Sequence, residues 1–259
     1  MKIAVTGKVG VGKTTLSSVL ARLYADEGRP VLCADADPDA NLGLALGFTE
    51  EELDGLTPIS QMSDLIAERT GTSKGGYGSF FKINPKVDDI PDKFAIEKNG
   101  IKLLAMGTID SGGSGCVCPE SVVLKRVISE LVLRRDEVVI LDMEAGLEHL
   151  GRGTADFVEM FIVVVEPGAR SVQTYKNVRR LAEDLGVKKT RVVANKVRSH
   201  EDEEFLRKSI PPEDFLGVIR YSAKVVDADR NAASPFDAAP EAVEDIKNIK
   251  RQIDIEAGI

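Results

Sequence analysis

Short apolar runs alternate with amphipathic segments along the first part of the chain, and this alternation predicts strands and helices in turn. Lys2–Thr6 and Pro30–Asp35 are apolar runs of strand length. Between them, the segment from Lys13 to Asp26 has helical spacing, and Gly28 follows it as a C-terminal stop. The apolar positions of that helix are Leu16, Val19, Leu20 and Leu23.

The second half repeats this pattern and indicates the fold class. A helix is expected over Val172–Leu185, among continuous apolar runs with the composition of buried strands. Those runs are Glu137–Asp142, Phe161–Val165, Arg191–Ala194 and Phe215–Arg220. Continuous apolar strands with helices between them predict an α/β fold, in which a mostly parallel central sheet has helices on both faces. Residues 1–259 are expected to form a single domain.

The middle of the chain is less regular. Ser60–Arg69 has a helical pattern, whereas residues 70–91 are rich in Gly, Lys, Pro and Asp and are expected to be a loop. Phe94–Lys98 and Ile101–Met106 flank Asn99-Gly100, a pair typical of hairpin turns. Pro119 is expected to open a helix, because proline is tolerated in a first helical turn.

Composition and charge narrow the class of protein. Of the 259 residues, 43% are hydrophobic and 29% are charged, as in ordinary globular proteins. The net charge of −8 argues against nucleic acid as a partner. No stretch approaches the roughly 20 apolar residues of a membrane span, and the run Ile3-Ala4-Val5 is too short for a signal peptide. We therefore expect a cytoplasmic protein without stable membrane association.

One motif predicts the chemistry. The loop Gly7-Lys8-Val9-Gly10-Val11-Gly12-Lys13-Thr14 has the full Gly-x4-Gly-Lys-Thr pattern of a phosphate-binding loop. Its glycines let backbone N–H groups turn toward phosphate oxygens, and the following helix adds the positive end of its dipole. Lys13 is expected to reach the β- and γ-phosphates of ATP or ADP, and the Thr14 hydroxyl to ligate Mg²⁺. Thr15 completes the nucleotide-binding segment.

Lys8 distinguishes this loop from the general pattern. In this position, the lysine resembles that of the deviant Walker A family, which includes nitrogenase iron proteins, arsenite-pump ATPases and MinD-type ATPases. The resemblance implies that Lys8 crosses a homodimer interface and touches the partner's nucleotide. It also implies that Asp37, directly before Pro38, lies near Mg²⁺ and orients the attacking water.

Two further segments fit nucleotide binding. The strand ending at Asp142 has the form of a Walker B segment, whose aspartate holds Mg²⁺. Gly146 follows in a segment where its N–H is expected to contact the γ-phosphate. The family resemblance implies that Asn195 reads the purine base. Lys196-Val197 lacks the aspartate that would hold a guanine, which favours ATP over GTP.

A pair of cysteines points to a metal. Cys116 and Cys118 are separated by one residue, so their thiolates can bind one soft metal ion from the same side. Two ligands seldom complete a site, and a homodimer would supply four. Ni²⁺ or Zn²⁺ suits such a set. His149 is a further candidate donor.

At these segments the chain resembles the carbon monoxide dehydrogenase accessory ATPases of the CooC type. The specific carriers are Gly-Cys-Val-Cys-Pro at 115–119 and the run from Asp142 to Gly153, and the likeness weakens after about Lys196. The resemblance implies a nucleotide-dependent homodimer that carries nickel at the paired cysteines. Its client would be carbon monoxide dehydrogenase or the acetyl-CoA synthase complex.

Two other functions compete with this one. A MinD-type regulatory or partitioning ATPase would need a basic amphipathic tail, and Glu241–Ile259 mixes acids with its lysines. An iron–sulfur electron-transfer ATPase of the nitrogenase type would take cysteines from two segments. Here both lie in one segment.

Overall fold

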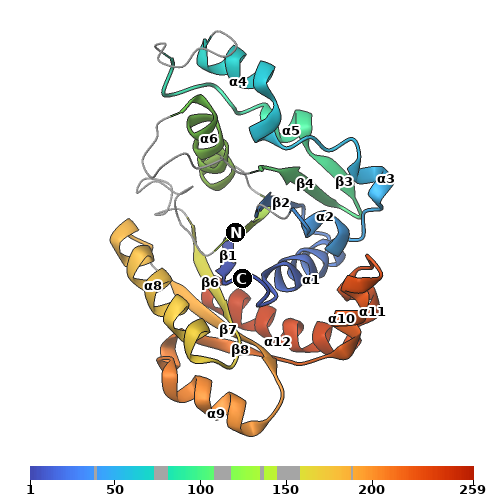
Figure 1. Ribbon diagram of the computed structural model, residues 1–259, viewed down its shortest axis with the longest axis vertical. Coiled ribbons are helices and arrows are strands. Elements are labelled where there is room, and N and C mark those ends of the chain that lie inside the picture. The colour runs from blue at the N-terminus through green and yellow to red at the C-terminus, as the bar shows by residue number, and fades with distance from the viewer. Residues whose placement is uncertain (38–39, 73–80, 108–117, 135–136, 145–157, 188) are drawn as a thin grey trace.

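The computed structural model describes residues 1–37, 40–72, 81–107, 118–134, 137–144, 158–187 and 189–259. Within these ranges, eight strands form one sheet in the order β3-β4-β2-β5-β1-β6-β7-β8 (Figure 1). Neighbouring strands are parallel except β3 and β4, which are antiparallel. The strands are Lys2–Gly7 (β1), Val31–Ala36 (β2), Ile96–Lys98 (β3), Ile101–Ala105 (β4), Val138–Met143 (β5), Met160–Val165 (β6), Thr190–Val197 (β7) and Phe215–Arg220 (β8).

Helices cover both faces of this sheet (Figure 1). The longer ones are Lys13–Asp26 (α1), Pro119–Arg134 (α6), Ala169–Leu185 (α8), His200–Ser209 (α9), Ala223–Arg230 (α10) and Pro240–Ala257 (α12). The shorter ones are Leu42–Ala45 (α2), Glu50–Leu53 (α3), Ser63–Thr70 (α4), Ile90–Phe94 (α5) and Pro235–Ala238 (α11), with 3-10 turns at Ile59–Gln61 and Pro212–Asp214. The predicted α/β fold is confirmed, and the assignment of residues 1–259 to a single domain stays a prediction.

The central strand explains why the strands are continuously apolar. Ile3 and Val5 of β1 pack with α1 and α12 on one face, and Ala4 packs with α6 on the other. All six residues of β1, β2, β5 and β6 are buried. A strand buried on both faces has no polar side to alternate with, which is the usual condition of parallel sheets.

The strand order also determines where a ligand binds. β1 lies between β5 and β6, so the chain crosses from one side of β1 to the other after β5. In open α/β sheets, ligands bind outside the carboxyl ends of the strands at such a switch point. The phosphate loop follows directly from the carboxyl end of β1.

The predicted hairpin is confirmed. Asn99 and Gly100 have φ of 51° and 73°, and they connect β3 to β4 with Lys98 paired to Ile101. Positive φ at both positions is what a two-residue turn needs to match the strand twist. The prediction that a strand begins at Phe94 is wrong, because Phe94 ends α5 and β3 begins at Ile96.

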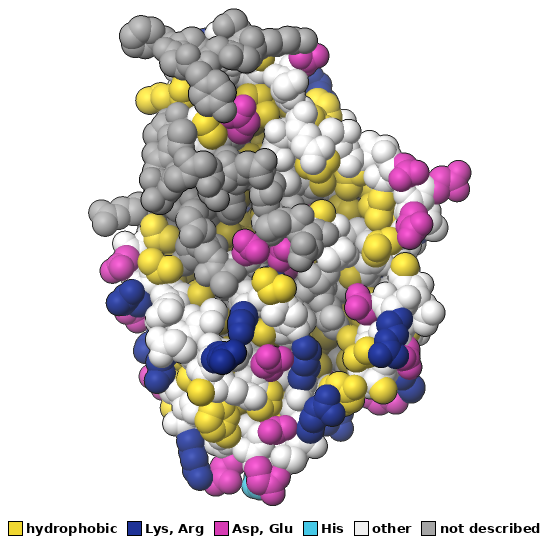
Figure 2. Space-filling view, in the orientation of Figure 1, with side chains coloured by type: hydrophobic (Ala, Val, Ile, Leu, Met, Phe, Trp, Pro, Cys, Tyr) yellow, Lys and Arg dark blue, Asp and Glu magenta, His cyan; other side chains and the backbone are white. Residues whose placement is uncertain are grey.

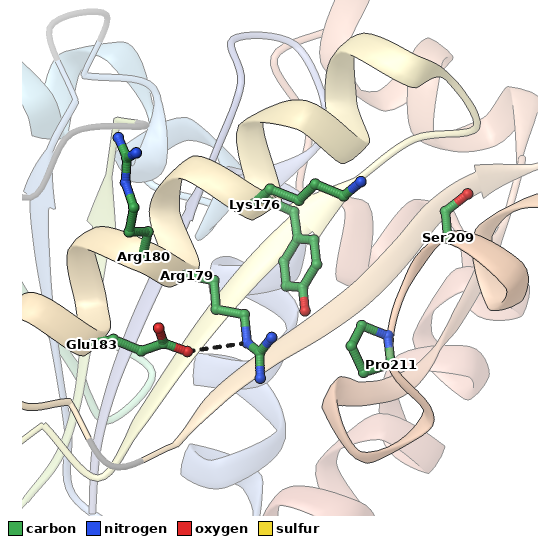
Figure 3. A pocket seen from close by; sticks show the side chains of 7 residues that line it. Lys176, Arg179, Arg180, Glu183, Ser209 and Pro211 are labelled. Atoms are coloured by element: carbon green, nitrogen blue, oxygen red, sulfur yellow. Dashed lines mark ion pairs between the residues drawn. The ribbon is translucent and has the colours of Figure 1, made fainter.

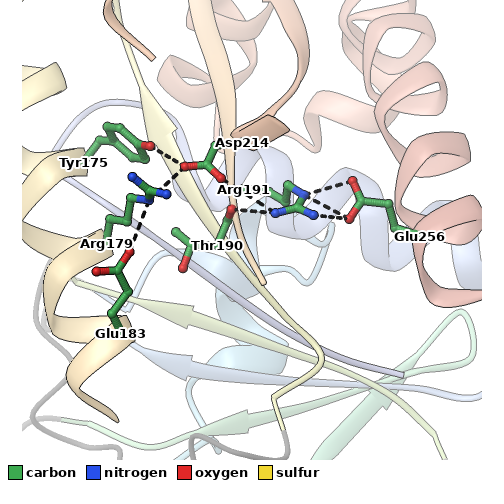
Figure 4. Close-up of polar contacts among 7 residues, drawn as sticks. All are labelled: Tyr175, Arg179, Glu183, Thr190, Arg191, Asp214 and Glu256. Carbon is green, nitrogen blue, oxygen red and sulfur yellow. Dashed lines mark hydrogen bonds and ion pairs between the residues drawn. The ribbon is translucent and has the colours of Figure 1, made fainter. Parts of the chain in front are cut away.

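A polar network closes the opposite edge of the sheet, at the amino ends of β7 and β8 (Figure 4). Asp214 is buried, accepts a hydrogen bond of 2.5 Å from the Tyr175 hydroxyl, and lies 3.0 Å from the Arg179 Nε. Arg191 lies 3.8 Å from Asp214 and pairs with Glu256 of α12 at 2.9 Å. Burial and the Asp214 charge raise the pKa of Tyr175. The network joins α8, β7 and α12 on the side away from the phosphate loop.

Charged side chains are mixed by sign on the face seen in Figure 2. Lys and Arg alternate there with Asp and Glu over the lower part of the molecule. The same mixing occurs along single helices, as where Lys208 pairs with Glu204 of α9 at 2.7 Å. Pairs this exposed contribute little to stability.

Candidate nucleotide and metal site

The phosphate loop takes a conformation that requires glycine. Gly10 and Gly12 have φ of 78° and 96°, a region that residues with a Cβ seldom adopt. A Cβ on Gly7 would lie 2.5 Å from the carbonyl oxygen of Val164, and one on Gly12 would lie 2.1 Å from the Asn195 Nδ2. Gly7 and Gly12 are therefore packed tightly against β6 and β7, with space only for a backbone.

The amino end of α1 suits an anion. Gly12 is its N-cap and provides no side-chain hydrogen bond, and the first turn contains no acidic residue. The first N–H groups of a helix have no partner within it, and their partial positive charge favours phosphate. The Lys13 side chain is buried here, with its Nζ 3.1 Å from Asp37 Oδ2. Lys13 and Asp37, which the sequence predicted to share the site, are thus in contact.

Two carboxylates lie side by side at the carboxyl ends of β2 and β5, where Asp35 is paired in register with Asp142. Asp35 accepts hydrogen bonds from the N–H groups of Asp37 and Leu42 at 3.2 and 3.0 Å. Burial raises its pKa to about 6, although these hydrogen bonds oppose the rise. The oxygens of Asp35 hold the turn after β2 through these hydrogen bonds.

Asp142 is fully buried, and neither of its carboxylate oxygens has a hydrogen bond of ordinary geometry. Burial, followed by the charge of Asp35, raises its pKa to about 7, although nearby Thr14 and Lys13 lower it. A buried carboxylate without a hydrogen bond of ordinary geometry calls for a cation, and oxygen ligands of this kind suit Mg²⁺. Asp142 and Thr14 therefore fit the predicted Mg²⁺ site, and their role as its ligands stays a prediction.

Side chains near the carboxyl ends of β1 and β7 contact the loop or the end of the strand beside it. The Thr6 hydroxyl donates to the Glu144 carbonyl at 2.5 Å, directly after β5. Asn195 Nδ2 donates to the Val11 carbonyl at 2.7 Å, and Lys196 Nζ donates to the Gly10 carbonyl at 2.5 Å. The sequence reading gave Asn195 a role at the base and gave Thr6 and Lys196 none. Their one signal was position, because each lies at the carboxyl end of a strand beside the loop.

The metal prediction is tested only in part. Cys118 is half-buried directly before α6, and its Sγ accepts a hydrogen bond from the Ser121 N–H at 3.4 Å. Cys116, Gly146 and His149 lie outside the described residues. Among the residues that the structure describes, no group of three or more His, Cys, Asp or Glu is placed to hold a metal ion. A complete nickel or zinc site therefore stays a prediction.

A separate hollow of about 370 Å³ lies along α8 (Figure 3). Its lining is partly cationic and consists of Tyr175, Lys176, Arg179, Arg180, Glu183, Ser209 and Pro211. Tyr175 and Arg179 contact Asp214 beside the amino ends of β7 and β8, so the hollow is not part of the nucleotide site. No described helix is long and apolar enough to cross a membrane.

Comparisons with known proteins agree with this geometry. Residues 2–236 match the CbiA family, the CobQ/CobB/MinD/ParA nucleotide binding domain. The carbon monoxide dehydrogenase accessory protein CooC of Rhodospirillum rubrum is 47% identical over 240 residues, which cover 93% of this chain and 91% of that protein. An uncharacterized ATP-binding protein of Methanocaldococcus jannaschii is also 47% identical, over 96% of both chains.

A solved structure agrees on the fold. The Aquifex aeolicus MinC:MinD cell division complex contains a chain that superposes with a TM-score of 0.67 at 20% identity, over 98% of this chain and 95% of that one. Such low identity supports the fold alone, whereas the sequence matches also establish the family and its ATPase chemistry with nucleotide and Mg²⁺. The chain therefore belongs to the CobQ/CobB/MinD/ParA family of nucleotide-binding proteins and, within it, to the ATPases of the CooC type.

Proposed function

We propose that this ATPase is a nickel carrier that matures carbon monoxide dehydrogenase or the acetyl-CoA synthase complex in the cytoplasm. It works as a nucleotide-dependent homodimer, in which Cys116 and Cys118 of both subunits hold one Ni²⁺, with Zn²⁺ as a competitor. The observation that carries the proposal is the 47% identity to a carbon monoxide dehydrogenase accessory protein over nearly the whole chain.

The position of Cys118 supports a connection between metal and nucleotide. It lies on the segment that runs from the end of β4 to the start of α6. β4 is parallel to β2 and adjacent to it, so this segment leaves the sheet at the edge that carries Asp35 and Asp37. On this proposal, Cys118 and the phosphate ligands lie at the same edge of the sheet, where a change in the nucleotide would act on both.

The number of thiolate ligands that one subunit supplies is the reason to propose a dimer. Two thiolates leave a divalent ion half-coordinated, and a second subunit supplies the other two. The third cysteine, Cys33, does not contribute, because it is fully buried inside β2. Burial and the charges of Asp142 and Asp35 raise the pKa of its thiol, which keeps it protonated and a poor ligand.

The test is anaerobic Ni²⁺ titration of wild type, Cys116→Ser and Cys118→Ser, with ATP or ADP present and the oligomer mass recorded. Wild type should bind one Ni²⁺ per dimer, and each serine variant should lose tight binding while it keeps nucleotide binding. Cys33→Ala is the matched control and should bind metal as wild type does. If either serine variant binds one Ni²⁺ per dimer at wild-type affinity, the four-thiolate proposal is wrong. Cluster absorbance in anaerobically purified protein would instead favour an iron–sulfur ATPase.

A further inference from the structure

Two consecutive residues at the end of β7 hold two consecutive carbonyl groups of the phosphate loop. Asn195 donates to Val11, and Lys196 donates to Gly10. Asn195 is 7% exposed, and its Oδ1 accepts a hydrogen bond of 2.8 Å from the Lys196 N–H. The side-chain amide of Asn195 is therefore used on both sides by backbone groups.

The geometry of the peptide bond gives these contacts a consequence. A trans peptide is planar, so the C=O of one residue points opposite to the N–H of the next, and the described chain has no cis peptide. Fixing the Gly10 carbonyl therefore fixes the direction of the Val11 N–H. Fixing the Val11 carbonyl likewise fixes the Gly12 N–H. Both N–H groups belong to the loop whose amides bind phosphate.

The Val11 N–H is poorly satisfied by the protein. Its hydrogen bond to the Lys8 carbonyl has an N···O distance of 3.4 Å, well beyond the usual 2.9–3.0 Å of such bonds. A phosphate oxygen would be a better acceptor for this donor. The loop is therefore held in a shape whose donors are oriented before a ligand arrives.

Lys196 keeps its position at a conformational cost. Its φ is 58°, in the left-handed region that a lysine seldom adopts. The strain is sustained by the Asn195 hydrogen bond, by the contact with Gly10 and by Glu166, whose Oε2 lies 3.5 Å from Lys196 Nζ. Strained backbone of this kind concentrates at functional sites.

We propose that Asn195 and Lys196 are positioning residues, which orient the Gly12 and Val11 amides toward the nucleotide phosphates during ATP binding and hydrolysis. This role differs from purine recognition at Asn195, because it applies to any ligand with a polyphosphate chain. It concerns the ATPase reaction alone and does not depend on the proposed nickel function.

The first experiment separates phosphate positioning from base recognition. Asn195→Ala removes the side-chain donor to the Val11 carbonyl without adding a charge beside the phosphate loop. Binding of ATP, GTP and inorganic tripolyphosphate, each with Mg²⁺, is measured by calorimetry. All three affinities should fall by a similar factor of about ten, as expected for a lost buried hydrogen bond. If tripolyphosphate binds as it does to wild type, the proposal is wrong, and a selective loss of ATP would assign Asn195 to the base.

The second experiment separates positioning from folding. Lys196→Met removes the donor and should weaken tripolyphosphate and ATP alike, whereas Lys196→Arg keeps charge and donors and should restore most of the affinity. Lys196→Gly removes both the donor and the backbone strain, so its melting temperature should not fall while its affinity matches that of Lys196→Met. Lys208→Met, which removes an exposed lysine of α9, controls for net charge. Wild-type tripolyphosphate affinity in Lys196→Met or Lys196→Gly would overturn the role of Lys196.

Discussion

Asp142 should destabilise the metal-free protein at neutral and alkaline pH. In the folded chain its pKa is raised from 3.8 to about 7, chiefly by burial. The folded state therefore holds a proton that the unfolded state releases above about pH 4. By this linkage, the contribution of protonated Asp142 to the free energy of unfolding is present at low pH, and it is lost as the pH rises to about 7.

The size of this effect on the free energy of unfolding follows from the same two pKa values. A rise from 3.8 to about 7 corresponds to about 4 kcal/mol against the ionised form. Asp142→Asn removes the charge, but it leaves a buried amide without partners, which costs about 2 kcal/mol. At about pH 8.5 the variant should therefore be more stable than wild type by about 2 kcal/mol. At about pH 5 wild-type Asp142 is mostly protonated, and the variant should be no more stable than wild type.

The assay is urea unfolding from about pH 5 to about pH 8.5, in EDTA and without nucleotide. Burial also raises the pKa of Asp35, to about 6, so the informative quantity is the difference between variant and wild type. Asp229→Asn, at an exposed position, should show no pH-dependent difference. A difference for Asp142→Asn that does not change with pH would refute the reasoning. Added Mg²⁺ and ADP should stabilise wild type and not the variant.

Three further predictions concern hydrolysis. Lys13→Ala should abolish phosphate release, because the β- and γ-phosphates lose the buried ammonium beside Asp37; turnover at the wild-type rate would contradict this. Asp37→Asn should bind Mg-ATP but hydrolyse it on the order of 100-fold more slowly, the effect of losing a group that orients or deprotonates water. A failure to bind nucleotide would instead make Asp37 a binding residue. Lys8 is at an exposed position of the loop. The Lys8→Ala variant should still bind ATP as a monomer, but native mass measurements should show a weaker dimer. If the dimer and the rate of ATP hydrolysis are unchanged, Lys8 has no role across the interface.

Many helices and strands of this protein could be predicted because they depend on patterns among neighbouring residues. The helix over Lys13–Asp26 and the strand Phe215–Arg220 were predicted with the boundaries that the structure has. Helical spacing, a glycine stop and apolar runs are all visible in a few neighbouring residues. The order of the strands was not predicted, because it depends on pairings between residues far apart in the sequence. The short helices α2 and α3 were missed because four residues contain too little periodic pattern.

In the functional site, too, some residues could be predicted from local sequence and others could not. The phosphate loop has a fixed spacing, so its residues could be named from the sequence. Thr6 and Lys196 contact the loop or its neighbour through single side-chain hydrogen bonds to backbone carbonyls. Every residue has such a carbonyl, and the sequence contains no sign of which one a side chain reaches. Only the register of β7 beside β6, and of β6 beside β1, brings Lys196 to Gly10.

The contrast between Asp35 and Asp142 shows what three-dimensional information adds. Both are aspartates near the carboxyl ends of adjacent parallel strands, paired in register and buried. From sequence, Asp142 has the form of a Walker B aspartate, and Asp35 is one of the acids around the end of the second strand. The structure gives Asp35 a backbone N–H for each of its oxygens, and gives the oxygens of Asp142 none. A carboxylate whose lone pairs are already occupied by N–H groups has less to offer a cation, whereas an unsatisfied one is stabilised by it. This difference in donors adds a physical reason, beyond the Walker B pattern, to expect Asp142 and not Asp35 to face Mg²⁺.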